Sequence, residues 1–379
     1  MNTLIKRELE KEILKRFTSG HVVVLYGARR VGKTTLINSI VKKLKGKIKF
    51  INAENSIQRN EISTENFYKL QNILKKYDYL IIDEAQKISN IGQILKIIVD
   101  NVKDIKILVS GSASFELANQ IGEPLTGRKR TLTLYPISIS ELYEDDENII
   151  NEQIEDRLIY GSYPKVILSP DNQERKEELN EVADSYLYKD ILELEEIRNS
   201  AKLKDLLILL ALQIGSEVSL NELANNLKIH VNTVSRYLDL LEKVFVIYRL
   251  TGFSRNLRKE ISKSCKYYFF DNGIRNTLIN NFNPLNLRDD TGKLWENFLM
   301  SERLKLLNNN IEFVNRYFWR TYDQKEIDLI EEKGGRLFTY EFKYKKGKSK
   351  TPNEFLKTYS KSSFNIINNT NYIEFITKI

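Results

Sequence analysis

A glycine-rich stretch near the N-terminus, residues 27–35 (GARRVGKTT), constrains the fold of this chain more than any other feature. It has the spacing G-x-x-x-x-G-K-[ST] and follows an apolar, β-branched run, residues 21–26 (HVVVLY). Such a run predicts a buried parallel strand, and residues 34–44 predict the helix that follows the loop. In a strand–loop–helix of this kind, backbone N–H groups and the helix N-terminus surround a phosphate. The sequence therefore predicts a phosphate-binding loop.

The loop motif assigns a role to its polar side chains. Lys33 is expected to reach the β and γ phosphates of ATP, and the Thr34 hydroxyl is expected to bind Mg²⁺. The predicted nucleotide-binding residues of the loop are Gly27, Arg30, Val31, Gly32, Lys33, Thr34 and Thr35. A chance glycine-rich turn is the alternative, and the flanking strand and helix disfavour it.

Two carboxylates end a second apolar run, residues 79–84 (YLIIDE). Asp83 is placed to hold the Mg²⁺ shell, directly or through water. Glu84 is the expected base that orients an attacking water, a role that typically contributes about 10² to 10⁴ in rate. An ordinary strand end followed by solvated acids is the alternative, and the loop motif upstream makes it less favoured.

Strands and helices alternate over the first 110 residues, which predicts a doubly wound parallel α/β sheet with ligands at the carboxyl ends of the strands. The expected strands are residues 21–26, 47–51, 78–83 and 106–110, and the expected helices are 7–17, 34–44, 65–76 and 92–101. Ser110 falls at a strand end, where its hydroxyl is a candidate sensor of the γ-phosphate. A small-residue turn explains Ser110 equally well.

Arg128 lies in a basic loop before an alternating strand, residues 131–134. An arginine there is a candidate to stabilise transition-state charge, within its own chain or from a neighbouring copy. A solvated basic loop is the alternative.

Composition limits the class of protein. A chain of 379 residues is long for one core and suggests about two to four domains. The net charge of +8 favours a polyanionic partner. One cysteine and two histidines exclude an internal disulfide and disfavour Cys- or His-rich metal sites and Ser-His-Asp chemistry. The longest apolar run, residues 206–212, is too short to span a bilayer, so a cytoplasmic location without membrane association is expected.

The middle of the chain changes character. Residues 151–199 predict helices, interrupted by Gly-Ser-Tyr-Pro at 161–164, that are able to fold over a bound nucleotide. Residues 219–227 begin with a capping box, Ser219 and Glu222, and a short turn leads to a second helix, 232–243. This arrangement predicts a helix-turn-helix with Arg236 on its polar side.

A basic loop follows the helix-turn-helix and is a candidate wing for DNA phosphates. Its cationic residues are Arg255, Arg258, Lys259, Lys263 and Lys266. A helix-turn-helix used for packing or dimerisation is the alternative.

The last segment predicts an α/β arrangement with acidic and basic residues on neighbouring elements. Glu296 lies in an expected helix, 293–307, and Asp328 lies at the middle of an expected strand, 325–330. Glu341 and Lys343 share one face of the next strand. Such residues can bind Mg²⁺ or Mn²⁺ and position water at a phosphodiester. Exposed strands also often carry this pattern, which is the simpler interpretation.

Four stretches together resemble the prokaryotic AAA+ ATPases of the archaeal-type ATPase group. They are residues 27–35, 81–86 (IIDEAQ), 109–112 (VSGS) and 125–128 (LTGR). The similarity covers nearly the whole chain and implies a P-loop core, a helical lid, a winged helix and a C-terminal domain. It also implies that Pro164 of the lid approaches the nucleotide base and that Arg128 is the candidate finger or sensor arginine.

Residues 266–275 and 292–299 resemble the start of that group's C-terminal domain, which is similar to the PD-(D/E)XK nuclease fold. By this resemblance Glu296, Asp328, Glu341 and Lys343 match the nuclease motif. The fold also occurs as an inactive scaffold. The implied domains are a core (1–146), a lid (147–200), a winged helix (201–270) and a restriction-nuclease-like α/β domain (271–379).

These features predict an ATP-hydrolysing protein whose domains rearrange with nucleotide to act on DNA. The alternative is a nucleotide-dependent regulatory or protein-interaction switch with an inactive nuclease-like scaffold. A P-loop kinase is disfavoured by the helix-turn-helix extension. A homo-oligomer and a protein partner both remain open.

Overall fold

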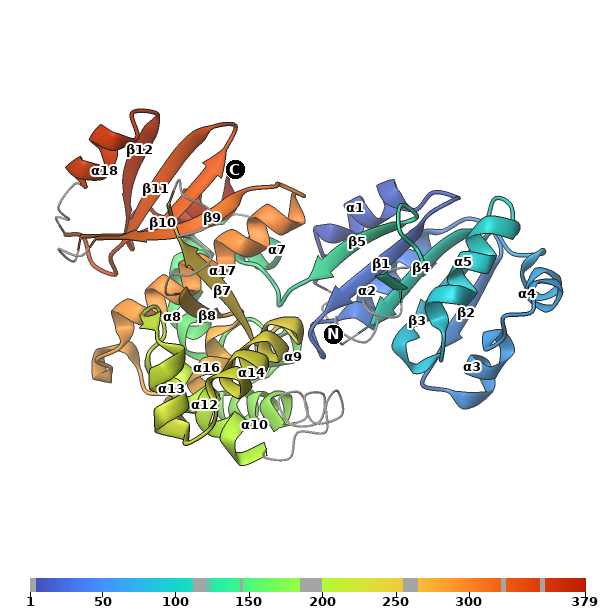
Figure 1. Ribbon diagram of the computed structural model, residues 1–379, viewed down its shortest axis with the longest axis horizontal. Coiled ribbons are helices and arrows are strands. Elements are labelled where there is room, and N and C mark those ends of the chain that lie inside the picture. The colour runs from blue at the N-terminus through green and yellow to red at the C-terminus, as the bar shows by residue number, and fades with distance from the viewer. Residues whose placement is uncertain are drawn as a thin grey trace. The chain divides into compact units, whose positions relative to one another are not determined.

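A computed structural model describes residues 5–111, 121–122, 124–143, 146–184, 200–254, 265–321, 325–347 and 352–379. The chain forms two compact units, Met1–Pro136 and Ile137–Ile379 (Figure 1). The first expected boundary, after residue 146, therefore falls inside the second unit. The lid, winged helix and nuclease-like domain expected from the sequence all lie in that second unit.

The first unit is a five-stranded parallel sheet with the strand order β2-β3-β4-β1-β5. Its strands are β1 (Val22–Gly27), β2 (Ile48–Asn52), β3 (Tyr79–Asp83), β4 (Lys106–Gly111) and β5 (Lys129–Leu134). Its helices include α1 (Leu9–Arg16), α2 (Lys33–Lys43), α3 (Ser56–Ile62), α4 (Phe67–Leu74) and α5 (Ile91–Asn101), with a 3₁₀ turn at Ala85–Lys87. This confirms the predicted α/β core.

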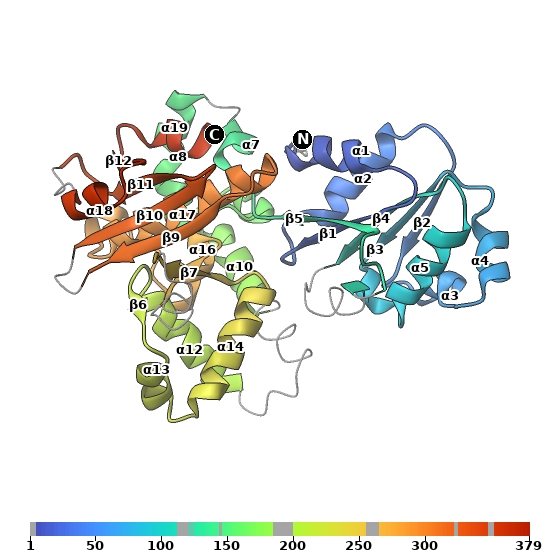
Figure 2. The ribbon, with the colours of Figure 1, turned by 45° about the horizontal axis from the view of Figure 1, so that its top comes forward.

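Helices cover both faces of this sheet, with α1 and α2 on one face and α3, α4 and α5 on the other (Figure 2). Every residue of β1 and β3 is buried as a result. Strands covered on both faces carry continuous apolar runs, which is why HVVVLY and YLIID lack a polar alternation.

The second unit contains a seven-stranded mixed sheet with the order β12-β11-β10-β9-β7-β8-β6. Its strands are β6 (Glu217–Val218), β7 (Ile247–Gly252), β8 (Cys265–Phe269), β9 (Asn315–Arg320), β10 (Glu326–Lys333), β11 (Arg336–Phe342) and β12 (Ser362–Ile367). Its helices include α7 (Ile139–Tyr143), α8 (Glu147–Tyr160), α9 (Pro164–Leu168), α10 (Asn172–Ala183), α12 (Ser200–Leu212), α13 (Leu220–Leu227) and α14 (Val231–Lys243). Further along the chain lie α16 (Asn272–Leu278), a 3₁₀ turn (Leu285–Leu287), α17 (Thr291–Asn309), α18 (Asn353–Thr358) and α19 (Tyr372–Thr377).

One sheet contains both the strands that flank the expected wing and the C-terminal strands. β7 pairs antiparallel with β8 on one side and parallel with β9 on the other, through Thr251–Tyr317 and Gly252–Phe318. Phe253 N–H extends this ladder by donating to the Phe318 carbonyl at 2.6 Å. The boundary expected at 270/271 therefore lies within a continuous sheet, because both edges of β7 are occupied.

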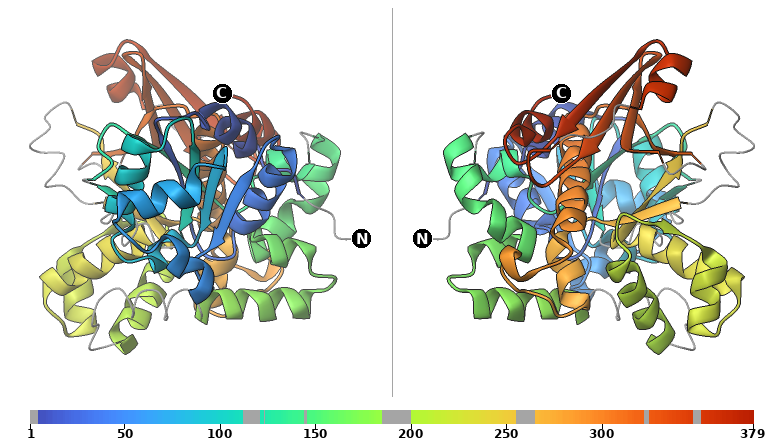
Figure 3. Two further views of the ribbon diagram at one scale, coloured as in Figure 1. Left: turned by 90° about the vertical axis from the view of Figure 1, so that its right-hand side faces the viewer. Right: turned by 90° about the vertical axis from the view of Figure 1, so that its left-hand side faces the viewer.

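The long helix α17 is the central packing element of the second unit (Figure 3, orange). Leu294, Trp295 and Phe298 are all at most 4% exposed. Its polar residue Asn297 is also buried, donating to the Asn272 side chain at 2.6 Å and bonding both the N–H and the carbonyl of Phe269. A buried amide of this kind must be fully hydrogen-bonded, so α17 fixes the start of α16.

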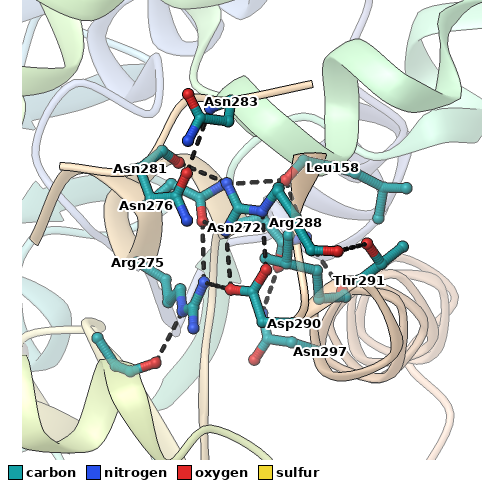
Figure 4. A network of polar contacts seen from close by, with 12 residues as sticks. Leu158, Asn272, Arg275, Asn276, Asn281, Asn283, Arg288, Asp290, Thr291 and Asn297 are labelled. Atoms are coloured by element: carbon teal, nitrogen blue, oxygen red, sulfur yellow. Dashed lines mark hydrogen bonds and ion pairs between the residues drawn. The ribbon is translucent and has the colours of Figure 1, made fainter. Parts of the chain in front are cut away.

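A buried polar network fastens the expected lid and helix-turn-helix to the C-terminal part (Figure 4). Asn276 Nδ2 donates to the last carbonyls of α8, those of Leu158 and Ile159, at 3.2 and 2.8 Å. Arg275 Nε donates to the carbonyl of Ala211 in α12 at 2.8 Å. These bonds join α8, α12 and α16, which explains why the three expected domains form one unit.

Asp290 balances two buried arginines in the same network. Arg288 donates to it at 2.8 Å, and Arg275 also pairs with it. Burial by itself would raise the pKa of Asp290, but the hydrogen bonds and charges of Arg288 and Arg275 outweigh burial and lower the pKa to about 2. The carboxylate is therefore ionised at neutral pH.

The Gly-Ser-Tyr-Pro stretch is held against α16. Asp271 accepts the Ser162 N–H at 2.7 Å and caps α16 by accepting the Gly273 N–H at 2.9 Å. Gly161 has φ 72°, and a Cβ there would lie 2.0 Å from the nearer Asp271 oxygen. Glycine is thus required at 161 by packing as well as by backbone conformation. The described part of the expected lid lies in the second unit and contacts α16 there.

Candidate functional site

The predicted phosphate loop joins β1 to α2 as expected. Gly27 ends β1 in register with Leu134, and an added Cβ would lie 2.3 Å from the Leu134 carbonyl oxygen. Gly32 has φ 95° and is the N-cap of α2 without any side-chain cap. The first N–H groups of a helix have no partner within the helix, and those of Lys33, Thr34 and Thr35 lie at the loop.

Lys33 carries its charge into the loop. Its side chain is 5% exposed, and Nζ donates to the carbonyl oxygens of Gly27 and Ala28 at 2.9 and 2.8 Å. The ammonium therefore lies among the backbone groups that would surround a phosphate. A positive charge there matches the multiple negative charge of a triphosphate.

Three oxygen-bearing side chains converge at the carboxyl ends of neighbouring strands. Thr34 Oγ1 donates to Asp83 Oδ2 at 2.7 Å, and Ser110 Oγ donates to Asp83 Oδ1. The parallel pairing of β3 with β4 brings Asp83 and Ser110 together, and Thr34 follows from the loop after β1. Hydroxyl and carboxylate oxygens are the ligands that Mg²⁺ prefers. The residues present therefore fit the metal.

Glu84 has an unusual backbone conformation beside this cluster. Its φ of 56° is left-handed, and its N–H donates to Ser110 Oγ at 3.3 Å. Its Oε2 accepts from Gln86 Nε2 at 2.6 Å. Gln86, 8% exposed, has no role predicted from the sequence, although it follows the acidic pair within the same short turn. Strained residues held by neighbours are common at functional sites.

Arg128 does not lie with these residues. Its carbonyl accepts the N–H of Val22, the first residue of β1, and its side chain pairs with Asp100 at 2.8 Å. Because β5 runs parallel to β1, the residue before β5 lies near the N-terminal ends of these strands, whereas Gly27 lies at their C-terminal ends. A six-residue strand spans roughly 17–20 Å, so in this structure Arg128 lies about one strand length from the phosphate loop of its own chain. Action from a neighbouring copy stays a prediction.

The four nuclease-motif residues come from three elements of the second unit. Glu296 of α17 accepts from the Tyr268 hydroxyl at 2.6 Å, and Asp328 of β10 accepts the Phe342 N–H at 2.7 Å. Lys343, directly after β11, pairs with Glu341 at 2.7 Å. Burial and the negative charges of Glu296 and Glu341 raise the pKa of Asp328 well above its usual range. The acids therefore share one electrostatic environment.

A buried lysine provides positive charge within this acidic cluster. Lys266 is 2% exposed, and its Nζ pairs with Glu326 and lies 3.7 Å from Glu296 Oε1. Burial lowers the pKa of Lys266, but the charges of Glu296, Glu326 and Asp328 outweigh burial and raise it. Among the residues that the structure describes, no three His, Cys, Asp or Glu side chains are placed to hold one metal ion.

The expectation that Lys266 belongs to a basic DNA-facing wing is therefore wrong. Its ammonium group lies instead with acids from α17 and β10. Local sequence could not predict this burial, because Lys266 follows a run of cationic residues. Arg255, Arg258, Lys259 and Lys263 lie outside the described residues.

The helix-turn-helix has the predicted two-sided character. Ser219 Oγ caps α13 by accepting the Glu222 N–H at 3.3 Å. In α14, Val234 and Leu238 are buried, whereas Arg236 is exposed. Arg236 lines a cavity of about 830 Å³ between α14 and the β6–β8 strands, together with the acids Glu217, Asp239 and Glu242 and with Arg249. This face therefore carries both signs of charge.

Pro164 is the first residue of α9, where its fixed φ suits a helix start. Its approach to the nucleotide base stays a prediction.

No helix in the described part of the chain is both long and apolar enough to cross a membrane.

Residues 19–143 match a family described as AAA domain. Residues 151–285 and 291–375 match two domains of unknown function, DUF8612 and DUF4143.

An uncharacterized protein of Mycobacterium tuberculosis is 28% identical over 342 residues, covering 89% of this chain and 74% of that protein. Another uncharacterized protein, of Methanocaldococcus jannaschii, is 26% identical over 337 residues, covering 83% and 73% respectively. A solved Walker-type ATPase of Pyrococcus abyssi shares 18% identity with a TM-score of 0.48, covering 73% of this chain and 96% of its own.

The AAA-domain match spans the predicted phosphate loop, Asp83, Glu84 and Ser110, and ends before Pro164. It agrees with the parallel strand order of the first unit and with the strand–loop–helix at Gly27–Thr34. The first unit therefore has the fold of an AAA-type P-loop ATPase. The two families of unknown function assign no activity to the second unit.

Proposed function

We propose that the protein binds ATP with Mg²⁺ in its first unit, hydrolyses it, and uses the change of nucleotide state to alter how its second unit holds DNA. The observation that carries the ATPase proposal is the convergence of Thr34, Asp83 and Ser110 beside the loop that contains Lys33. Fold alone does not specify an activity, but this set of groups suits phosphoryl transfer to water.

Each side chain has a distinct role in the proposal. Lys33 stabilises negative charge on the phosphates, while Thr34 and Asp83 hold the metal. When bound, Mg²⁺ supplies charge neutralisation at the β and γ phosphates. Glu84 orients and polarises the attacking water, and Gln86 keeps its carboxylate in position through the 2.6 Å hydrogen bond. Ser110 of β4 holds Asp83 and Glu84 in place, because its hydroxyl donates to the Asp83 carboxylate and accepts the Glu84 N–H.

ATP turnover by the purified chain tests the proposal. Lys33→Ala should abolish nucleotide binding, whereas Glu84→Gln should retain binding and lose about 10² to 10⁴ in turnover. Lys42→Ala, an exposed lysine of the same helix, and Glu54→Gln, an exposed acid, are the matched controls and should behave as wild type. Wild-type turnover in Glu84→Gln would remove Glu84 from the mechanism, and absence of nucleotide binding in the wild type would overturn the proposal.

The DNA part of the proposal is supported by the net charge of +8 and by the exposed polar side of α14. DNA affinity should fall steeply with salt concentration, because bound cationic side chains release counterions. Arg255→Ala and Arg258→Ala should each weaken binding and reduce the salt slope by about one, because each removes one cation from a phosphate. A DNA affinity that does not change with salt concentration, or no binding to single- or double-stranded DNA, would make a protein the better candidate partner.

A second candidate, a nucleotide-dependent switch with a nuclease-like scaffold, is favoured by the position of Lys266 among the acids. A lysine ammonium that already neutralises these carboxylates competes with a metal for them. An active nuclease should nick DNA with Mg²⁺ or Mn²⁺ and lose that activity in Asp328→Ala and Lys343→Ala. No cleavage of any DNA form by intact protein would support the scaffold.

A further inference from the structure

Arg7 joins the phosphate loop to the end of the first unit. It precedes α1, lies outside the residues matched by the AAA family, and is 7% exposed. Its Nη1 donates to the carbonyl of Val31 at 2.8 Å, and its Nη2 donates to the carbonyl of Tyr135 at 2.6 Å. A single guanidinium thus links a residue of the loop motif with the penultimate residue of the first unit.

The segment at Tyr135 is short and stiff. Pro136 follows it, which restricts Tyr135 to extended conformations. The preceding residue, Leu134, is in register with Gly27 and approaches it so closely that no Cβ fits between them. The exit from β5 therefore contacts the phosphate loop through Gly27 and, by way of Arg7, through Val31.

The chain is fixed again as soon as it enters the second unit. Ile137 N–H donates to the Ser162 carbonyl at 3.0 Å, and the Ile137 carbonyl accepts from Lys305 Nζ at 3.2 Å. Ile139 N–H donates to Glu302 Oε2 at 2.8 Å. One residue, Pro136, separates the point held by Arg7 from the first point held within the second unit.

We infer that Arg7 is a positioning residue that transmits the state of the phosphate loop to residues 135–139, and this inference rests on the proposed nucleotide binding. Val31 lies in the loop that surrounds the phosphates, so a change in that loop moves its carbonyl. The guanidinium is planar and rigid, so its two hydrogen bonds move together and Tyr135 follows. With only a proline between Tyr135 and Ile137, the displacement reaches the hydrogen bonds of Ile137 and Ile139.

Hydrogen exchange at the Ile137 and Ile139 amides tests this role, with and without a saturating non-hydrolysable ATP analogue and Mg²⁺. In the wild type, nucleotide should change the exchange rates by about twofold to tenfold, the range for making or breaking one hydrogen bond. Arg7→Lys keeps the charge but not the fork, and Arg7→Met removes both. Each should bind nucleotide at saturation while the two amides lose their response.

Arg16→Met is the matched control, because Arg16 lies on α1 and pairs with Glu12 of the same helix at 3.2 Å. It should respond to nucleotide as the wild type does. A wild-type response in folded Arg7→Lys would overturn the inference, as would nucleotide binding without any response in the wild type. Absence of nucleotide binding by the wild type would instead show that the proposed function fails. If Arg7→Met does not fold, Arg7→Lys alone decides.

Discussion

At the scale of single residues, Gly27 shows how closely the phosphate loop is packed. Its neighbour across the sheet is a backbone carbonyl, that of Leu134, which cannot rotate away as a side chain can. The position therefore admits no larger residue without separating β1 from β5. That requirement is independent of any bound nucleotide.

Gly27→Ala should destabilise the first unit by about 1–3 kcal/mol, the usual cost of overpacking, and weaken nucleotide binding. Denaturant unfolding followed by circular dichroism measures the first effect, and nucleotide titration measures the second. Gly122→Ala is the control, because nothing lies within 4 Å of the added Cβ. An alanine variant of Gly27 as stable as the control would show that the strands separate without cost.

The positions of side chains could be predicted where a motif fixes both spacing and surroundings. Lys33, Thr34 and Asp83 lie together as expected, because the loop and the strand end specify where each side chain lies, and their roles stay predictions. The positions of Lys266 and Arg128 could not be predicted, because their surroundings are set by partners distant in the sequence. The pattern of residues 131–134 predicts a strand but not the strand that pairs with it. The parallel pairing with β1 places Arg128 at the opposite end of the strands from Gly27.

At the scale of elements, helix ends connect parts of the second unit that are far apart in sequence. Asp271 uses one carboxylate oxygen for the first turn of α16 and the other for Ser162, just after α8. An N-cap side chain accepts from N–H groups in the first turn of its own helix. Here the cap also holds α8 against α16.

Asp271→Asn should destabilise the second unit by about 1–3 kcal/mol, since an amide offers one acceptor oxygen where two are used. Asp171→Asn is a matched control, because Asp171 caps α10 with a single oxygen, which accepts the Gln173 and Glu174 N–H groups. Asparagine serves as well at such a position. Urea unfolding should separate the two variants, and equal stabilities would contradict the double role of Asp271.

The helices and strands themselves could be predicted well from local patterns. The strand β1, the helix α14 and the Ser219 cap depend on residues close in sequence. The pairing of β7 with β9 could not be predicted in this way, because strand pairing depends on which edge is free in the folded sheet. That pairing and the network around Asn276 hold the last three expected domains together in the second unit.

At the scale of the whole molecule, the second unit should unfold as one cooperative body. Its polar network is buried and joins α8, α12, α16 and α17, so breaking one part exposes polar groups in the others. Both tryptophans, Trp295 and Trp319, lie in this unit, so tryptophan fluorescence follows its unfolding alone.

Asp290→Asn should lower the stability of this unit by about 3–5 kcal/mol at neutral pH, because it removes the carboxylate with which two buried arginines pair. In the wild type, the Asp290 pKa of about 2 lies below its unfolded value. The ionised Asp290 therefore contributes to the free energy of unfolding above about pH 4, and this contribution is lost as the pH falls through about 2.

The difference in free energy of unfolding between wild type and Asp290→Asn should become smaller as the pH falls from about 4 to about 2. Urea unfolding followed by tryptophan fluorescence measures this difference. Asp289→Asn removes an exposed carboxylate whose charge also acts on Arg275, and it should cause a smaller loss of stability than Asp290→Asn. A difference that stays constant from about pH 5 to about pH 2 would contradict the ion-pair assignment.

The pairing of β7 with β9 has a practical consequence for anyone who shortens this protein. A chain ended after residue 270 would lose the strand that covers β7 and would present bare backbone N–H and C=O groups to solvent. Unpaired strand edges recruit other chains, so such a fragment should aggregate during expression. Function should therefore be dissected with point substitutions in the intact chain.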